Sequence, residues 1–336
     1  MNIQENISLK SYNTFAIDAR AKYFGSFTNV DQLYELLVHP SAKNPFVLGG
    51  GSNILIRGDM DRMVLKNEVS GIEVVNEDEH HVYVKVGAGQ NWHQFVLYCI
   101  DRDWPGVENL SLIPGNVGAA PMQNIGAYGV ELKEVFEELE AYHFEERKIY
   151  ALSANDCEFG YRDSAFKGKW KDQFLILSVT LRLNKIPVFH TSYGAVQEEL
   201  EKMGVKDLSI AAISKAVIRI RESKLPDPAK IGNAGSFFKN PSVNGSRFEI
   251  LSKEFPGIVG YKNEDGSMKL AAGWLIEQCG WKGFRKGDAG VHEKQALVLV
   301  NYGKASGQEI YDLSAEILES VKNKFGVILE REVNII

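Results

Sequence analysis

Residues 232–241, with the sequence GNAGSFFKNP, have the composition of a loop that could do chemistry on a bound ligand. Small residues surround Ser236, so the backbone can approach a ligand closely while the serine hydroxyl faces it. Two aromatics, a lysine and an amide follow. The pattern is typical of a catalytic loop, and it is equally compatible with a tight turn in which the serine hydrogen-bonds its own backbone.

Two other segments carry charged side chains suited to an anionic substrate. Residues 159–164 read FGYRDS, and the guanidinium of Arg162 can bind a carboxylate or an enolate through two N–H groups. Residues 329–333 read LEREV, with Glu330 and Glu332 on one face of a predicted final strand. Their repulsion is relieved if one contacts a cation or is protonated. For Glu330 a solvated or salt-bridged edge position is favoured.

Glycine-rich segments in the first half of the chain could bind phosphate. The run GGGSN at 49–53 offers successive backbone N–H groups, with Ser52 and Asn53 as further hydrogen-bonding side chains. It lacks the last glycine of the G-x-G-x-x-G fingerprint and leads into a predicted strand, which disfavours a nicotinamide-binding Rossmann domain. A pyrophosphate nest and a glycine-rich hairpin are both compatible with this run.

The composition indicates a globular chain of two or three domains. The 336 residues are 44% hydrophobic and 24% charged, which suffices for separate cores. The formal net charge is -6 without a long basic run, which argues against a nucleic-acid partner. Since the sequence shows neither a signal-peptide core nor an apolar run of membrane length, we expect a cytoplasmic protein without a membrane partner.

Cysteine and histidine spacing predicts no metal site. Cys99, Cys157 and Cys279 are widely separated and form no C-x-x-C pair, so we expect reduced, packed thiols. His80 and His81 lie in a polar stretch before a predicted strand, where a solvated side chain is more common than a metal ligand.

Hydrophobic periodicity predicts a strand-rich first half and a second part that begins with a helix. Strands are predicted at 46–48, 54–56, 63–65 and 82–86, and a short helix follows capping-box-like residues at 28–31. The pattern weakens at 185–208, and a helix over 209–223 places a domain boundary there. A last helix runs from the capping box of Ser306 and Glu309 to near Gly326, and a strand over 327–336 ends the chain.

Together these segments resemble the motifs of the UDP-N-acetylenolpyruvoylglucosamine reductase (MurB) family, in its type I branch. The similarity also includes SYNTF at 11–15, VLGGGSNILI at 47–56, IPGNVGAAPMQNIGAYG at 113–129 and KLPDP at 224–228, and thus covers nearly the whole chain. It implies an α+β fold with a two-part FAD-binding domain of the vanillyl-alcohol-oxidase (PCMH) type at 1–70 and 71–208. A smaller α+β substrate-binding domain is expected at 209–326, and the strand 327–336 is expected to return near the first part.

The resemblance implies a flavoprotein oxidoreductase of peptidoglycan synthesis, and hence a role in cell-wall biogenesis, cell shape, the cell cycle and cell division. In this family NADPH reduces non-covalent FAD, and hydride then passes to the enolpyruvyl ether of UDP-N-acetyl-3-O-(1-carboxyvinyl)-glucosamine to give UDP-N-acetylmuramate. Arg162 and Glu332 match the residues that stabilise the resulting enolate. Ser236 is assigned as the proton donor.

The same resemblance implies the ligand contacts. The substrate-binding positions are Tyr161, Tyr193, Lys224, Asn240 and Gln295. The cofactor-binding positions are Gly49, Gly50, Gly51, Ser52, Asn53, Gly115, Gly118, Gln123, Asn124 and Gly129. Tyr193 is expected on a mobile loop that closes over the uridine diphosphate, and an ordinary surface loop is the competing interpretation. The implied partners are the UDP-sugar and NADPH, and the expected state is a monomer.

Two other function classes are compatible with part of the pattern. A flavin oxidase or dehydrogenase of the same cofactor fold would need a pocket without the set of Arg162, Ser236 and Glu332, and a covalently attached flavin would support it. A nucleotide-sugar-binding protein that has lost catalysis is the other alternative. The presence of both the serine and the glutamate argues against it.

Overall fold

A computed structural model describes residues 3–336, and this part of the chain divides into two compact units. The first unit contains residues 3–7, 21–51 and 60–223, and the second contains residues 8–20, 52–59 and 224–336. The domains predicted from the sequence have other boundaries. The predicted substrate-binding domain at 209–326 begins with helix α5 (Ile210–Lys224). In the structure, this helix belongs to the first unit as far as Ser223. The assignment of FAD binding to residues 1–70 and 71–208, and of substrate binding to residues 209–326, stays a prediction.

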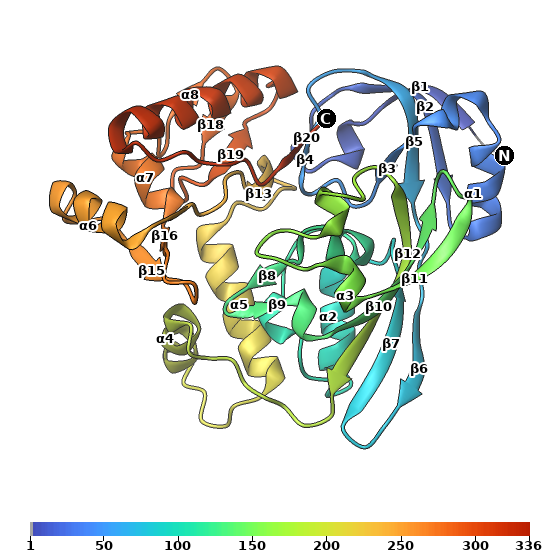
Figure 1. Cartoon of the computed structure of the whole chain (residues 1–336), viewed down its shortest axis with the longest axis horizontal. Coiled ribbons are helices and arrows are strands. Elements are labelled where there is room, and N and C mark those ends of the chain that lie inside the picture. Colours follow the sequence, from blue (N-terminus) through green and yellow to red (C-terminus); the bar gives the residue numbers. More distant parts are fainter. Residues whose placement is uncertain (1–2) are drawn as a thin grey trace. The chain divides into compact units, whose positions relative to one another are not determined.

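The first unit contains a four-stranded sheet in the order β1-β2-β5-β3 (Figure 1). Its strands are β1 (Ile3–Ser8), β2 (Arg20–Phe27), β3 (Phe46–Leu48) and β5 (Met60–Asn67). Both β2 and β3 run parallel to β5, which requires crossover connections, and α1 (Val30–Leu37) lies in the connection from β2 to β3. Asn29 caps α1 by accepting a hydrogen bond from the Gln32 amide. The predicted helix and the strands at 46–48 and 63–65 are confirmed.

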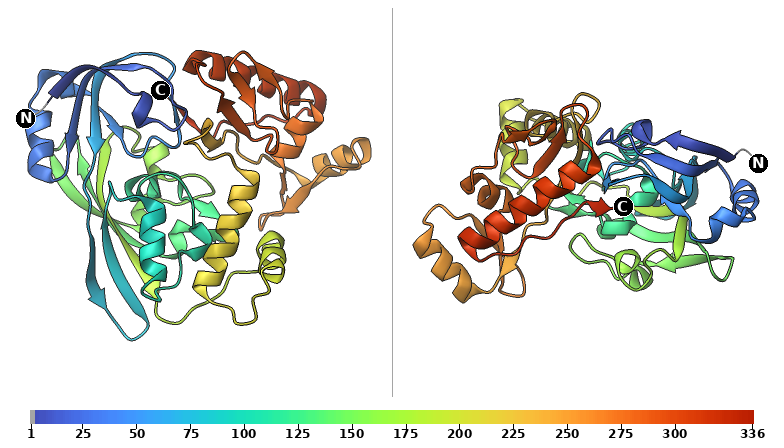
Figure 2. Two further views of the ribbon diagram at one scale, coloured as in Figure 1. Left: turned by 180° about the vertical axis from the view of Figure 1, so that it is seen from behind. Right: turned by 90° about the horizontal axis from the view of Figure 1, so that it is seen from above.

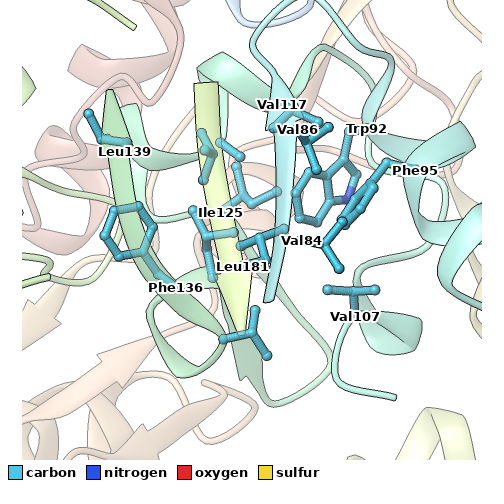
Figure 3. Packing of buried hydrophobic residues seen from close by; sticks show 14 of the residues in the cluster. Val84, Val86, Trp92, Phe95, Val107, Val117, Ile125, Phe136, Leu139 and Leu181 are labelled. Atoms are coloured by element: carbon cyan, nitrogen blue, oxygen red, sulfur yellow. The ribbon is translucent and has the colours of Figure 1, made fainter. Parts of the chain in front are cut away.

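A five-stranded antiparallel sheet, in the order β11-β10-β12-β7-β6, carries the larger core of the first unit. Its strands are β6 (Ile72–Glu77), β7 (His81–Gly87), β10 (Phe136–His143), β11 (Lys148–Ser153) and β12 (Phe174–Asn184). Figure 3 shows Val84 and Val86 of β7 beside Trp92 and Phe95 of α2 (Trp92–Ile100). Val117 joins the same core, so apolar burial anchors the glycine-rich segment 113–129 beside the sheet.

The remaining elements of the first unit are short. They are β8 (Gly126–Ala127), β9 (Val130–Glu131), α3 (Ala154–Cys157), α4 (Gly194–Lys202) and 3-10 helices at Pro40–Lys43, Glu108–Leu110, Val117–Ala119, Pro121–Gln123, Leu132–Glu134 and Ala165–Lys167. Helices α4 and α5 form a separate cluster around Val196, Ile213 and Val217. The predicted helix at 209–223 is confirmed as α5.

The second unit is built on an antiparallel sheet in the order β13-β19-β18-β17, with helix α8 against β18 and β19 (Figure 2). The sheet strands are β13 (Gly232–Ser236), β17 (Arg285–Lys286), β18 (Ala289–Val291) and β19 (Val298–Asn301). Around them lie β4 (Ile54–Leu55), β14 (Ser242–Val243), β15 (Gly260–Lys262), β16 (Met268–Leu270), β20 (Asn334–Ile335), α6 (Gly245–Glu254), α7 (Ala272–Gln278), α8 (Gly307–Phe325) and the 3-10 helix Lys10–Tyr12. No helix within residues 3–336 combines the length and apolar character of a membrane span.

Helix α8 confirms the predicted end signals. Ser306 and Glu309 form a reciprocal capping box, and Gly326 ends the helix in the left-handed conformation with φ 64°. The prediction of a strand over 327–336 is wrong for most of its length, because regular pairing is limited to β20 with β4. Upstream of β20, the chain lies against residues 237–239, where a single bridge joins Phe238 and Arg331.

The cysteines are free thiols, and two of them are packed as predicted. Cys99 and Cys157 are buried, whereas Cys279 is half-buried. Burial raises the pKa of both buried thiols, which keeps them protonated and poorly nucleophilic.

Candidate functional site

Ser236 lies at the end of an irregular strand. β13 pairs with β19, and the register shifts between Asn233 and Ser236, the signature of a bulge. Gly235 adopts φ 71° and donates its amide to Asn233 Oδ1 at 3.0 Å. The amide group of Asn233 donates in turn to the carbonyls of Pro226 and Ile231. The predicted loop is therefore a bulged strand end, and its bonds fix the backbone that leads to the half-buried Ser236.

The chain around Glu332 lies beside the Ser236 segment. The Glu332 amide donates to the Phe237 carbonyl at 2.8 Å, and the Lys239 amide donates to the Glu330 carbonyl at 2.9 Å. Phe237 and Phe238 are buried, so packing fixes the segment that both bonds join. The second unit thus brings Ser236 and Glu332 within a few residues of each other on paired chain segments.

Glu330 and Glu332 have different surroundings. Glu330 is exposed, and its carboxylate lies 3.6 Å from the ammonium of Lys239, which matches the salt-bridged edge position predicted for it. Glu332 is half-buried. Because Lys239 is paired with Glu330, this lysine is a poor candidate for stabilising charge on Ser236.

The predicted substrate residues Asn240 and Gln295 both lie at the beginning of α7. Asn240 Oδ1 accepts a hydrogen bond from the Ala272 amide at 3.0 Å. Gln295 Oε1 lies 3.2 Å from the position of a Cβ on Gly273. A side chain at Gly273 would therefore displace Gln295. The structure thus brings these two amide side chains to the same end of α7, and their contact with substrate stays a prediction.

Arg162 occupies a tight turn in the first unit. Gly160 and Asp163 exchange backbone hydrogen bonds at 3.0 and 3.3 Å, and Arg162 between them has φ 54°. A left-handed conformation is uncommon for a residue with a side chain and marks a backbone held by its surroundings. The guanidinium donates to the Gly126 carbonyl at 2.5 Å and lies 5.2 Å from the ring centre of the exposed Tyr161.

Asn124 has a role that the sequence did not indicate. It is buried, and its Nδ2 donates to the Gly160 carbonyl at 3.0 Å and to the Glu131 carboxylate at 2.9 Å. Its Oδ1 accepts from the Lys133 amide at 3.0 Å. The side-chain amide of Asn124 therefore holds the turn of Arg162, and the predicted contact of Asn124 with the cofactor stays a prediction.

Tyr193 is accompanied by two residues that the sequence analysis missed. Its ring meets Tyr128 edge to face, with centres 5.5 Å apart. The Tyr128 hydroxyl is hydrogen-bonded to Arg221, whose Nε donates to the Leu112 carbonyl at 3.1 Å. Burial lowers the pKa of Arg221, and the positive charge of Arg162 lowers it further. The interaction with Tyr128 raises this pKa and so partly offsets both effects. Arg221 precedes Lys224 by three residues in α5, a spacing that could have suggested a shared face.

The two glycine-rich segments of the first unit touch through their backbones. A Cβ on Gly50 would lie 2.8 Å from the Gly115 Cα and 2.9 Å from Asn116 Oδ1, so only glycine permits this approach. Gly51 and Gly115 have φ 63° and 114°. Asn116, which the sequence analysis also missed, ties the pair to a third segment by donating to the Gly89 carbonyl at 2.9 Å.

Family models match two parts of the chain. Residues 27–143 match an FAD binding domain, and residues 227–336 match the C-terminal domain of UDP-N-acetylenolpyruvoylglucosamine reductase. The reductase of Amoebophilus asiaticus is 52% identical, and that of Flavobacterium johnsoniae is 48% identical, each over the whole of both chains. The chain belongs to the UDP-N-acetylenolpyruvoylglucosamine reductase family. It is a flavin-dependent oxidoreductase, as the resemblance implied.

A solved structure supports the reductase fold. The crystal structure of the reductase from Thermus caldophilus matches with a TM-score of 0.68 and 23% identity, over 100% of this chain and 99% of the other. The predicted α+β architecture with an FAD-binding domain is thereby confirmed. Both glycine-rich segments fall within the matched FAD-binding region, and Ser236, Asn240, Gln295 and Glu332 fall within the matched C-terminal domain.

The residues at the glycine pair are of a kind that suits the phosphates of FAD, because their backbone N–H groups and a nearby lysine are available to an anion. Among the described residues, nothing in the protein lies within 4 Å of a Cβ on Gly49 or Gly129, so the protein itself leaves both positions open. Lys66 brings a half-buried ammonium to the Gly49 carbonyl at 3.0 Å. Burial lowers its pKa, and a bound pyrophosphate would favour the charged lysine. Gly118 packs closely within the protein, because its Cβ would meet that of Ala88 at 2.5 Å, and its contact with the cofactor stays a prediction.

Alanine at Gly50 and at Gly49 should weaken FAD binding by different routes. We expect Gly50→Ala to raise the FAD dissociation constant about tenfold or more and to lower the melting temperature of the apoprotein, because overpacking costs about 1–3 kcal/mol. Gly49→Ala should leave the apoprotein melting temperature unchanged and weaken FAD binding alone. Flavin fluorescence titration and thermal melting measure the two quantities.

The matched control for both variants is Gly58→Ala, since a Cβ there also meets nothing among the described residues. It should change neither quantity. Unaltered FAD affinity in both Gly49→Ala and Gly50→Ala would contradict the placement of the pyrophosphate at these segments.

Proposed function

We propose that this chain catalyses the NADPH-dependent reduction of UDP-N-acetyl-3-O-(1-carboxyvinyl)-glucosamine to UDP-N-acetylmuramate, a step of peptidoglycan precursor synthesis. The observation that carries the proposal is the paired arrangement of the Ser236 and Glu332 segments in a chain that matches reductases along its full length. FAD, when bound, carries the hydride between NADPH and the enolpyruvyl group. The tasks left to the protein are binding, charge stabilisation and proton transfer.

Ser236 is proposed as the proton donor to the enolate carbon. A serine hydroxyl is a weak acid, so its contribution depends on a fixed position close to the carbon that is protonated. The bulge at Gly235 and the bonds of Asn233 supply that fixed position. Glu332, on the neighbouring chain segment, is proposed to act on the same enolate.

Arg162 is proposed to bind the carboxylate that becomes part of the enolate. Its planar fork can donate two parallel hydrogen bonds to such a group. The bond to the Gly126 carbonyl and the stacking near Tyr161 orient the guanidinium before substrate arrives. Preorganised donors of this kind stabilise charge that develops in a transition state.

The remaining contacts are proposed as a group. Tyr161, Tyr193, Lys224, Asn240 and Gln295 hold the UDP-sugar, and the cofactor-binding positions named from the sequence surround FAD, with Asn124 acting through the turn of Arg162. Arg221 is a further cation in the neighbourhood of Arg162. We also propose a cytoplasmic monomer that acts without a membrane or nucleic-acid partner.

The purified protein should be yellow, with flavin that acid precipitation releases as free FAD. NADPH oxidation beyond one equivalent per bound FAD should require the enolpyruvyl substrate under anaerobic conditions, and the product should gain two hydrogens in its mass, because one hydride and one proton are added. Absorbance spectra and mass spectrometry of the product test this. Flavin retained on the precipitated protein would favour a flavin oxidase, and a colourless protein that FAD cannot reconstitute would contradict the proposal.

A further inference from the structure

Asn109 joins two segments of the first unit that are far apart in sequence. It lies in the 3-10 helix Glu108–Leu110 and is only 1% exposed. Its Nδ2 donates to the Tyr128 carbonyl at 3.0 Å and to the His190 carbonyl at 2.8 Å. One buried amide group therefore uses both of its hydrogens to hold the backbone at 128 and at 190 together.

The other half of this amide is unsatisfied. Asn109 Oδ1 is buried and has no hydrogen-bond partner among residues 3–336, which is destabilising for a polar atom. The stabilising contribution of the side chain therefore lies in its two donated bonds. An apolar residue of similar size would fill the same space and leave two carbonyls without their donor.

Both joined segments carry groups of the candidate site. Tyr128 meets the ring of Tyr193 edge to face and bonds Arg221 through its hydroxyl. His190 precedes Tyr193 by three residues in a stretch whose side chains are mostly exposed, with Ile186 72% and Val188 60% exposed. On the other side of Tyr193, its carbonyl accepts from the Val196 amide of α4 at 2.8 Å, and Phe189 packs against the cluster of α4 and α5. The bond to His190 adds a polar anchor to the exposed part of the chain that leads to Tyr193.

We propose that Asn109 is a positioning residue for substrate binding, which holds the Tyr193 segment against Tyr128 so that Tyr193 can close over the UDP-sugar. This inference rests on the proposed function. In this proposal Asn109 does not touch the substrate. It restricts the conformations of the Tyr193 segment before substrate binds. Such preorganisation lowers the entropic cost of binding and so increases affinity.

Asn109→Ala should raise KM for the UDP-sugar about tenfold, which corresponds to the net free energy of one hydrogen bond. The rate of FAD reduction by NADPH should stay that of the wild type. The matched control is Asn67→Ala. Asn67 is another buried asparagine, and its amide donates to the Ile176 carbonyl at 2.8 Å. The variant Asn67→Ala should have a lower melting temperature and an unchanged KM for the UDP-sugar. If Asn109→Ala and Asn67→Ala change KM equally, the positioning role is wrong.

A double-mutant cycle with Tyr193→Ala shows whether Asn109 acts through that tyrosine. In the Tyr193→Ala background, Asn109→Ala should change KM little further. Additive effects of the two substitutions on KM would overturn the proposal. An unchanged KM in Tyr193→Ala would also overturn it. In either case, substrate turnover by the wild type would still support the reductase function. Asn109→Leu serves in place of the alanine variant if the latter does not fold.

Limited proteolysis tests the same inference without turnover. Chymotrypsin cleavage after Tyr193, which is 54% exposed, should be faster in Asn109→Ala than in the wild type or Asn67→Ala, because the segment opens more often. Mass spectrometry of the fragments identifies the cleavage position. Equal cleavage rates in all three proteins would overturn the proposal whether or not the chain reduces the UDP-sugar.

Discussion

Replacement of Ser236 by alanine should slow the reoxidation of reduced flavin by the enolpyruvyl substrate by about 10²–10⁴-fold, the range typical of a lost general acid. FAD binding and FAD reduction by NADPH should stay close to the wild type, because neither step needs this proton. At the bulged end of β13, the Asn233 side chain bonds the Gly235 amide and two backbone carbonyls, and none of these bonds involves the Ser236 hydroxyl. Stopped-flow absorbance of the flavin measures each half-reaction separately.

Two further variants distinguish chemistry from structure at Ser236. Ser236→Cys should retain part of the activity, because a thiol can also donate a proton. Ser252→Ala changes a half-buried serine of α6 in the same unit, whose hydroxyl donates to the Glu249 carbonyl, and should leave both half-reactions unchanged. A purely structural serine predicts that Ser236→Ala loses thermal stability or substrate affinity while the chemical step keeps its rate.

Arg162→Lys should impair the substrate-driven step by about 10²-fold or more, comparable with removal of one preorganised donor to a developing negative charge. Lysine keeps the positive charge but lacks the planar fork that binds a carboxylate through two bonds. It also lacks the geometry that lets the guanidinium donate to the Gly126 carbonyl and lie near Tyr161. FAD reduction by NADPH should keep its rate in this variant.

Arg147→Lys is a matched control for this substitution. Arg147 has nearly the same left-handed backbone, φ 55° against 54° for Arg162, and it is exposed. The control therefore reproduces the change of side chain in the same backbone conformation outside the site. Equal losses in both half-reactions of Arg162→Lys would show that the arginine supports folding or flavin binding in general.

Local signals in the sequence were sufficient for elements with self-contained ends. Helix α8 is bounded by a capping box and a left-handed glycine, both of which are readable from residues close in the chain. The glycine-rich run at 49–53 was recognisable as a candidate phosphate loop for the same reason. The close backbone approach of Gly50 to Gly115 depends on long-range packing. Hydrophobic periodicity carries no information about such a contact.

The features that the sequence did not reveal depend on contacts between distant residues. The bond from Asn124 to the Gly160 carbonyl was not foreseen, because Gly160 lies 36 positions away. The segment 327–333 has the residue pattern of a strand, yet its neighbour at 237–239 is irregular and supports one bridge. Residues 8–20 and 52–59 join the second unit through tertiary contacts, which explains why a boundary placed by sequence pattern alone differs.

The most direct test of the central claim is an anaerobic single turnover. The protein with bound FAD is reduced by one equivalent of NADPH and then mixed with UDP-N-acetyl-3-O-(1-carboxyvinyl)-glucosamine, while the visible flavin absorbance is followed. We predict that the oxidised spectrum returns in the wild type with formation of UDP-N-acetylmuramate, and that it returns much more slowly in Ser236→Ala after equally fast reduction by NADPH. A flavin that stays reduced in the wild type, or a wild-type rate in Ser236→Ala, would contradict the proposed reaction or its proton donor, respectively.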